Sequence, residues 1–240
     1  MKNKIIMPKI KSEKRSEKEV TENGEKKSSN GWGQGGQLFG TEATENTFQG
    51  AGFKDKDKAQ ETLRLLDGRD PPYQFQIINS MYNRAKVIYK RTTDKDKRHN
   101  LNEAIDVFEK WIDDYKSHSR SKENFSYLPL ELMEDYLPLA KHYKISDTFL
   151  IAFKQVDGDI KKLRMKKVPE TEITWDIERN RNLRKLNENI RSNYLQLFET
   201  DEPLRGLPSK EHTEMILWGY SNDSTKIKKC IPLIKEKIDD

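Results

Sequence analysis

The chain has 240 residues, of which 33% are hydrophobic and 35% are charged, and its formal net charge is +5. This composition excludes one large continuous core and favours small helical units with solvated outer faces. A single cysteine, Cys230, excludes an internal disulfide framework and indicates a reducing compartment. The N-terminus lacks the apolar run of a secretory signal, and no stretch approaches the ~18 apolar residues of a membrane span. We therefore expect a nuclear or cytosolic protein that does not engage a membrane.

Residues 1–30 consist largely of Lys, Glu, Ser and Asn, with almost no large apolar residue after Met7. Such a segment cannot offset the entropy that ordering would cost, so we predict a disordered charged tail. Its basic residues between Lys9 and Arg15 fit a nuclear-import signal, although a solvated tail explains them more simply.

Residues 31–54 change character to a glycine-rich arm with spaced aromatic side chains. A G-x-G-x-x-G pattern begins at Gly31, but no strand precedes it and no helix follows, so it does not predict a dinucleotide site. Large aromatic side chains are costly to leave exposed, and we expect them to dock on the folded body or on a partner. The aromatic residues of the arm are Trp32, Phe39, Phe48 and Phe53.

A three-helix unit is predicted over residues 55–117. Asp57 is expected to cap a first helix that ends before Gly68. Asp70, followed by two prolines, is expected to cap a second helix that reaches about residue 90. The short connection makes the two helices an αα-hairpin, and a local ion pair between Arg69 and Asp70 is expected to hold its turn.

The third helix of this unit is predicted to follow a charged loop over residues 92–100, with its apolar stripe running from Leu101 to Tyr115. Residues 118–240 are predicted to form a second helical unit, whose longest helix extends from Trp175 to about Phe198 with Leu183 in its apolar stripe. Ser209 is expected to cap a later helix of this unit. No β-hairpin signal and no repeat of fixed period is visible. The predicted fold class is all-α, with small helical bundles and a disordered N-terminal arm.

The second predicted helix carries amide, tyrosine and basic side chains outside its apolar stripe. Tyrosine and arginine are enriched at the energetic centres of protein interfaces, so this face is the predicted protein-binding site. An ordinary solvated surface explains the same residues equally well. The predicted partner-binding residues are Tyr73, Asn79, Tyr82, Asn83, Arg84, Lys86 and Tyr89.

Two basic clusters favour nucleic acid as an alternative partner. Residues 161–167 follow a capped helix and a turn in the layout of a helix-turn-helix, and a further set lies on the long helix. Neither cluster has the residues that read base edges, so only phosphate contacts are predicted, and a solvated helix face explains both more simply. The residues are Lys161, Lys162, Arg164, Lys166 and Lys167 in the first cluster, and Arg179, Arg181, Arg184 and Arg191 in the second.

No linear motif indicates catalysis, a cofactor or a metal. The four histidines are scattered, with none at ligand spacing from another or from Cys230. Asp157 and Asp159 begin like a calcium loop, but the loop glycine and terminal Glu are missing, so a turn is predicted. The sequence therefore favours a non-enzymatic interaction or adaptor protein with no metal or cofactor. An enzyme whose polar side chains converge from separate helices stays an open alternative.

Overall fold

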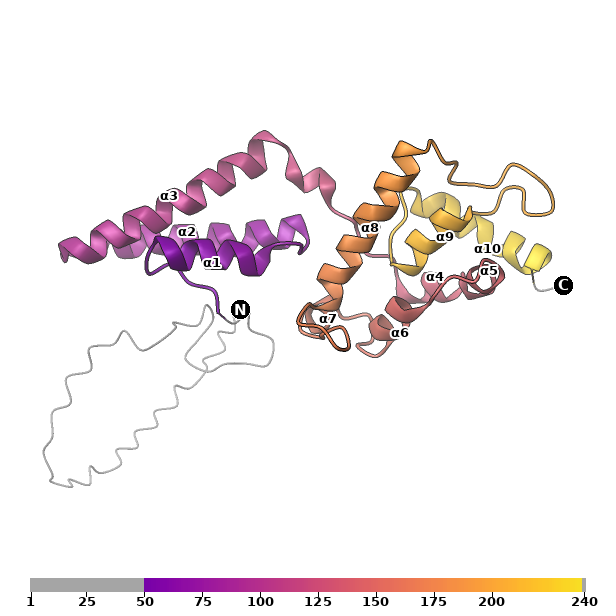
Figure 1. Cartoon of the computed structure of the whole chain (residues 1–240), viewed down its shortest axis with the longest axis horizontal. Helices are drawn as coiled ribbons and strands as arrows, with labels where there is room; N and C mark the ends of the chain where they lie inside the picture. Colours follow the sequence, from indigo (N-terminus) through magenta and orange to yellow (C-terminus); the bar gives the residue numbers. More distant parts are fainter. Residues whose placement is uncertain (1–49, 239–240) are drawn as a thin grey trace, which may run out of the picture. The chain divides into compact units, whose positions relative to one another are not determined.

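The computed structural model describes residues 50–238, and these residues confirm the all-α fold class (Figure 1). The predicted tail (1–30) and most of the predicted arm (31–54) lie outside them. Within residues 50–238, strand pairing is limited to two isolated bridges, Lys167 with Thr174 and Phe198 with Pro208. The helices are α1 (Lys56–Leu66), α2 (Pro71–Arg91), α3 (Lys95–Ser117), the 3-10 helix η1 (Arg120–Glu123), α4 (Leu130–Glu134), α5 (Leu137–His142), α6 (Thr148–Lys154), α7 (Ile160–Leu163), α8 (Trp175–Ser192), α9 (Lys210–Leu217) and α10 (Ser224–Ile238).

The starts of α1 and α3 differ from the predicted ones. The side chain of Asp55, not Asp57, caps α1 by accepting a hydrogen bond from the Lys58 amide at 2.8 Å. Asp94 caps α3 in the same way, so residues 95–100 are helical and the loop predicted over 92–100 is wrong over most of its length. These first turns are largely solvated, and an apolar stripe cannot reveal a helix that buries nothing.

The first hydrophobic core lies among α1, α2 and α3, with α3 packed along both other helices (Figure 1). Phe53, the one aromatic residue of the predicted arm within the described range, packs against this core. The start of the described chain is also fixed to α1, because the Gly52 amide donates to Thr62 Oγ1 at 2.8 Å. The fully buried members of this core are Ala59, Leu66, Ile77, Ile78, Met81, Ala104 and Phe108.

A second hydrophobic core is built from α4 to α10. The long helix α8 ends at Ser192, not near Phe198 as predicted. The residues that follow α8 bond to another segment, since the Leu197 carbonyl accepts hydrogen bonds from the Ser209 amide and from the His212 ring. The predicted cap of α9 is confirmed, with Ser209 Oγ accepting from the His212 amide.

His212 in α9 is fully buried, and its surroundings suit the neutral imidazole. Its Nδ1 lies 2.9 Å from the Leu197 carbonyl, which can only accept, so Nε2 accepts from the Ser221 hydroxyl at 2.9 Å. Burial lowers the pKa of His212 below its usual range, and nearby Lys226 adds to this while Asp223 and the Leu197 bond oppose it.

A pH dependence of stability follows from this burial. Below pH of about 6.5 the unfolded chain protonates His212 more fully than the folded chain, so we expect stability to fall with decreasing pH at up to roughly 1.4 kcal/mol per pH unit. Urea unfolding between pH 5.5 and 7.5 measures it, and His212→Gln is expected to flatten the profile over this window. An equally steep profile in the variant would assign the dependence to other groups.

Candidate functional site

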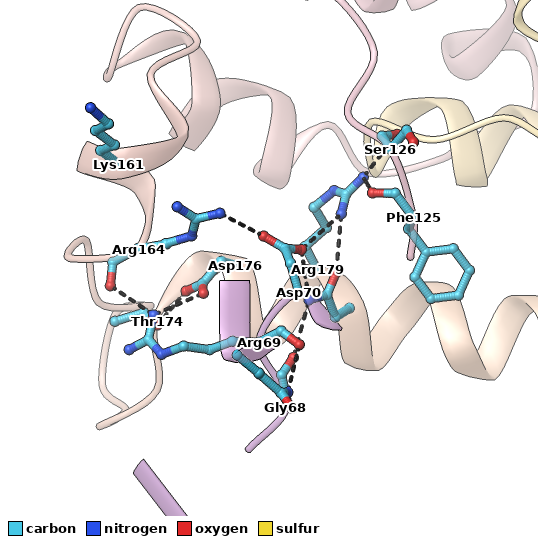
Figure 2. A network of polar contacts seen from close by, with 12 residues as sticks. Gly68, Arg69, Asp70, Phe125, Ser126, Lys161, Arg164, Thr174, Asp176 and Arg179 are labelled. Atoms are coloured by element: carbon cyan, nitrogen blue, oxygen red, sulfur yellow. Dashed lines mark hydrogen bonds and ion pairs between the residues drawn. The ribbon is translucent and has the colours of Figure 1, made fainter. Parts of the chain in front are cut away.

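A buried set of polar side chains joins the turn before α2 to the end of α7 and the first turns of α8 (Figure 2). The chain brings these residues together from positions about a hundred residues apart, as the long-range hydrogen bonds show. We call this set the arginine–aspartate network. Its members are Arg69, Asp70, Arg164, Asp176, Arg179 and Asn180.

Arg69 and Asp70, in the turn between α1 and α2, both bond to side chains that are distant in the sequence. The guanidinium of Arg69 pairs with Asp176 at 2.8 Å, and Asp70 accepts from Arg164 at 3.0 Å and from Asn180 at 3.1 Å. Asp70 is the N-cap residue of α2, as predicted, but its side chain makes no capping hydrogen bond to the helix. The turn is therefore held by hydrogen-bond donors and an acceptor at the end of α7 and on α8. These partners cannot be predicted from the sequence of the turn itself.

Arg179 is fully buried in the middle of the network. Its guanidinium donates to the carbonyls of Phe125, Trp218 and Gly219 at 2.9–3.1 Å and to Asn180 Oδ1 at 3.0 Å. The same group stacks 3.6 Å above the centre of the Tyr127 ring. Figure 2 shows Arg179 pointing between Asp70 on one side and Phe125 and Ser126 on the other. A single side chain thus joins α8 to two other segments of the chain by donating to their backbone carbonyls.

The charged side chains of the network pair with one another. Burial raises the pKa of Asp176 and lowers that of Arg179, because each charged form loses its water, and the nearby opposite charges counteract both shifts. Thr174 Oγ1 donates to the remaining oxygen of Asp176. Polar side chains from separate helices do converge here, as an enzyme with a non-linear site would require. These side chains bond to one another and to the backbone, so their role in the fold explains why they are buried together.

The tyrosines predicted to bind a partner make contacts within the chain. The Arg164 guanidinium lies 3.9 Å above the centre of the Tyr73 ring. The Tyr82 hydroxyl donates to Glu109 on α3 at 2.6 Å, and Lys86 lies over the same ring. The three tyrosines Tyr73, Tyr82 and Tyr89 are each only half-exposed, and the third carries the Arg98 guanidinium against its face. These aromatic rings therefore fasten α2 to its neighbours.

The exposed part of the predicted face is narrower and lies on the second half of α2. Asn83, Arg84, Val87 and Ile88 line one shallow hollow, in which Val87 is 45% exposed. Asn79 is bonded through its carbonyl to the Asn83 amide at 2.8 Å. The helix carries no acidic residue from Pro71 to Arg91, and its basic residues are Arg84, Lys86, Lys90 and Arg91. An aliphatic side chain within a basic and amide rim is what this surface presents to solvent.

The first basic cluster does not form a recognition helix. Helix α7 has only four residues, so the predicted helix-turn-helix layout is wrong, because a single turn cannot lie along a groove. Arg164 points inward to Asp70, Lys166 donates to Gln155, and Lys167 pairs with Glu172 at 2.5 Å. Lys161 and Lys162 are both exposed.

The arginines of α8 separate into one buried and three exposed residues. Arg179 belongs to the network, so its place in the predicted phosphate-binding set is wrong. Arg181, Arg184 and Arg191 are exposed, and the first of these lies 3.4 Å from Glu178. Residues from α8 line a groove with the end of α1, where Arg64, Arg181 and Arg184 approach one another. The sequence gives no signal for this meeting, because α1 and α8 are distant in the chain.

Sequence reasoning missed the network residues Asp176 and Asn180 and assigned Arg179 to the surface. The available signal was weak: the three sit at i, i+3 and i+4 on α8, in line with the stripe position Leu183. Such spacing places charged residues on the buried face, which is uncommon unless they are paired. The partners, however, come from the turn before α2 and could be identified only in three dimensions.

Cys230 is buried at 6% exposure, and its thiol lies 3.3 Å from the Lys226 carbonyl. Burial raises the pKa of this thiol, which agrees with a structural cysteine. Within residues 50–238, no helix has both the length and the low polarity needed to cross a bilayer, and no group of three or more His, Cys, Asp or Glu side chains is placed to hold a metal ion. No protein-family model and no curated protein matches this chain.

Proposed function

We propose that this chain is a non-enzymatic interaction protein that binds a protein partner through the second half of α2. The single observation that carries the proposal is Val87, an aliphatic side chain that is 45% exposed and lines a hollow together with Asn83, Arg84 and Ile88. Exposed apolar groups within a polar rim are typical of interaction sites, and burying Val87 would gain free energy for the complex.

The charge of α2 defines the expected partner. Arg84 supplies positive charge at the rim of the hollow, and the helix carries three further basic residues and no acidic one. We therefore expect a partner that presents an aliphatic or aromatic side chain flanked by Asp or Glu. Complementary charges at such a rim raise the association rate and select against basic competitors. The nucleus or the cytosol is the proposed location.

A matched pair of substitutions tests this surface. Val87→Asp and Arg84→Glu should each weaken recovery of the partner in affinity purification, and weaken its direct binding at least about tenfold, which is about 1.4 kcal/mol. Ile151→Asp is the control, because Ile151 on α6 is similarly exposed, at 48%, and lies outside the hollow. Circular dichroism verifies that all three variants fold. Unchanged binding by the two α2 variants, or equal loss with Ile151→Asp, would refute the proposal.

Nucleic acid is the alternative partner, with less support in the arrangement of the basic residues. Of the nine residues predicted for it, Arg164 is paired with Asp70, Lys167 is paired with Glu172, and Arg179 is fully buried. Titration of RNA and duplex DNA against salt tests it. A dissociation constant weaker than roughly 10⁻⁴ M at low salt would exclude it, since non-specific binders reach ~10⁻⁴–10⁻⁶ M at physiological salt.

A further inference from the structure

A groove runs between the end of α1, the segment before α8 and the first turns of α8. Leu65, Ile173 and Ile177 give it an apolar lining, and Leu65 is 39% exposed. Its arginines are Arg64, Arg69, Arg181 and Arg184, and its acidic residues are Asp67 and Glu172. Arg69 is paired with Asp176, Glu172 with Lys167 and Arg181 with Glu178. Three exposed arginines, Arg64, Arg181 and Arg184, still outnumber Asp67, the remaining exposed carboxylate of the groove, so the groove is positive on balance.

The chain enters the described structure beside this groove. Gly50 lies against Leu65, since a Cβ atom on this glycine would be 3.3 Å from Leu65 Cδ1. The next residue, Ala51, is buried at 8% exposure, and the Gly52 amide is bonded to Thr62. Gly50, the first described residue, therefore lies at the apolar lining, and the preceding part of the chain is covalently joined to it there.

The sequence of the tethered segment complements the groove. Residues 28–53 contain no Lys or Arg, although the chain as a whole has 45 of them. Within this stretch Glu42 and Glu45 carry negative charge, and Phe48 lies two residues before Gly50. At about 3.4 Å per extended residue, Phe48 reaches about 7 Å from Gly50 and Glu42 about 27 Å. Short tethers give effective concentrations of the order of millimolar, so even a weak contact would be well populated.

We propose that residues 42–48 of the chain bind in this groove, with Phe48 covering Leu65 and Ile177 and with the two glutamates facing Arg64, Arg181 and Arg184. The occupant is the chain's own arm, because charge, aromatic content and tether position all select it. This inference concerns a different surface from the α2 hollow and does not depend on the proposed function.

The test uses the full chain labelled with ¹⁵N, and measures backbone order parameters of residues 42–48. We expect values near ~0.85 in the native chain and below ~0.6 in the double variant Arg181→Glu/Arg184→Glu, because ordered and flexible backbones differ in this way. The matched control is Lys228→Glu/Lys229→Glu on α10, which makes the same charge change at exposed positions outside the groove and should leave the order unchanged.

A charge exchange makes the test specific. Adding Glu42→Arg/Glu45→Arg to the Arg181→Glu/Arg184→Glu chain should restore the order of residues 42–48, and Phe48→Ala alone should lower it. Low order parameters in the native chain would overturn the proposal, as would equal order in all variants. Order that rises with protein concentration, with contacts between labelled and unlabelled chains, would also overturn it by assigning the groove to a second copy.

Discussion

Replacing Arg179 by methionine is expected to lower the free energy of unfolding by about 3–5 kcal/mol, the range for breaking a buried charged pair. Methionine approximates the length of the side chain but donates no hydrogen bond. The carbonyls of Phe125 and Trp218 would then lose the Arg179 donor, the Gly219 carbonyl would keep only its bond from the Leu128 amide, and Asp70 would lose a nearby positive charge. Urea unfolding followed by circular dichroism measures the change.

Two further variants separate what the hydrogen-bond donors of the guanidinium contribute to stability from what its positive charge contributes. Arg179→Lys keeps a positive charge but cannot reach the same acceptors with five donors, so an intermediate loss is expected. Arg181→Met, two residues along α8 and exposed, makes the same chemical change on the surface and should alter stability by less than about 0.5 kcal/mol. Similar losses at the buried and the exposed arginine would show that the network does not bear the stability assigned to it.

Replacing Asp70 by alanine is the second large change, with an expected loss of about 3–5 kcal/mol. The carboxylate holds Arg164 at 3.0 Å and Asn180 at 3.1 Å, and lies 3.9 Å from Arg179. Removal leaves Arg164 and Arg179 without this carboxylate, and the other carboxylate of the network, Asp176, is already paired with Arg69. The control is Asp67→Ala, an exposed carboxylate at the end of α1, for which a change within about 0.5 kcal/mol is expected.

A double-mutant cycle tests the coupling directly. Asp70→Ala combined with Arg164→Met should cost less than the sum of the two single losses, with an interaction energy of about 0.5–3 kcal/mol, because each residue is the other's counter-charge. The same cycle with Arg184→Met should be additive. Additivity in both cycles would mean that the observed pair contributes packing and not charge.

The network also explains why the α2 face is smaller than the pattern of tyrosine and arginine suggests. Tyr73 supports Arg164, and Tyr82 supports Glu109 and Lys86, so these rings stabilise the fold. Substituting them would disturb packing as well as any partner contact. Arg84 and Val87 are therefore the sharper probes of binding, and they lie on the part of α2 that faces solvent.

The sequence alone determined the helical class, the apolar stripes of α2 and α3, the stop at Gly68 and the cap of α9. Each of these depends on residues within a turn or two, such as a Ser209 hydroxyl that reaches the His212 amide. The sequence did not predict where solvated helices begin, because the first turns of α3, which Asp94 caps, carry no apolar stripe. Local patterns report only what a segment buries or caps by itself.

Only the tertiary structure decided what the charged residues do. Arg179 and Arg181 are two positions apart and look alike in the sequence, yet one is fully buried and the other is exposed. The difference arises because residues two positions apart point to nearly opposite faces of α8, and a buried guanidinium is stable only where carbonyls and a carboxylate from other segments meet it. The Asp70 side chain, expected to cap α2, is a counter-ion for the same reason: its partners lie 94 and 110 residues away.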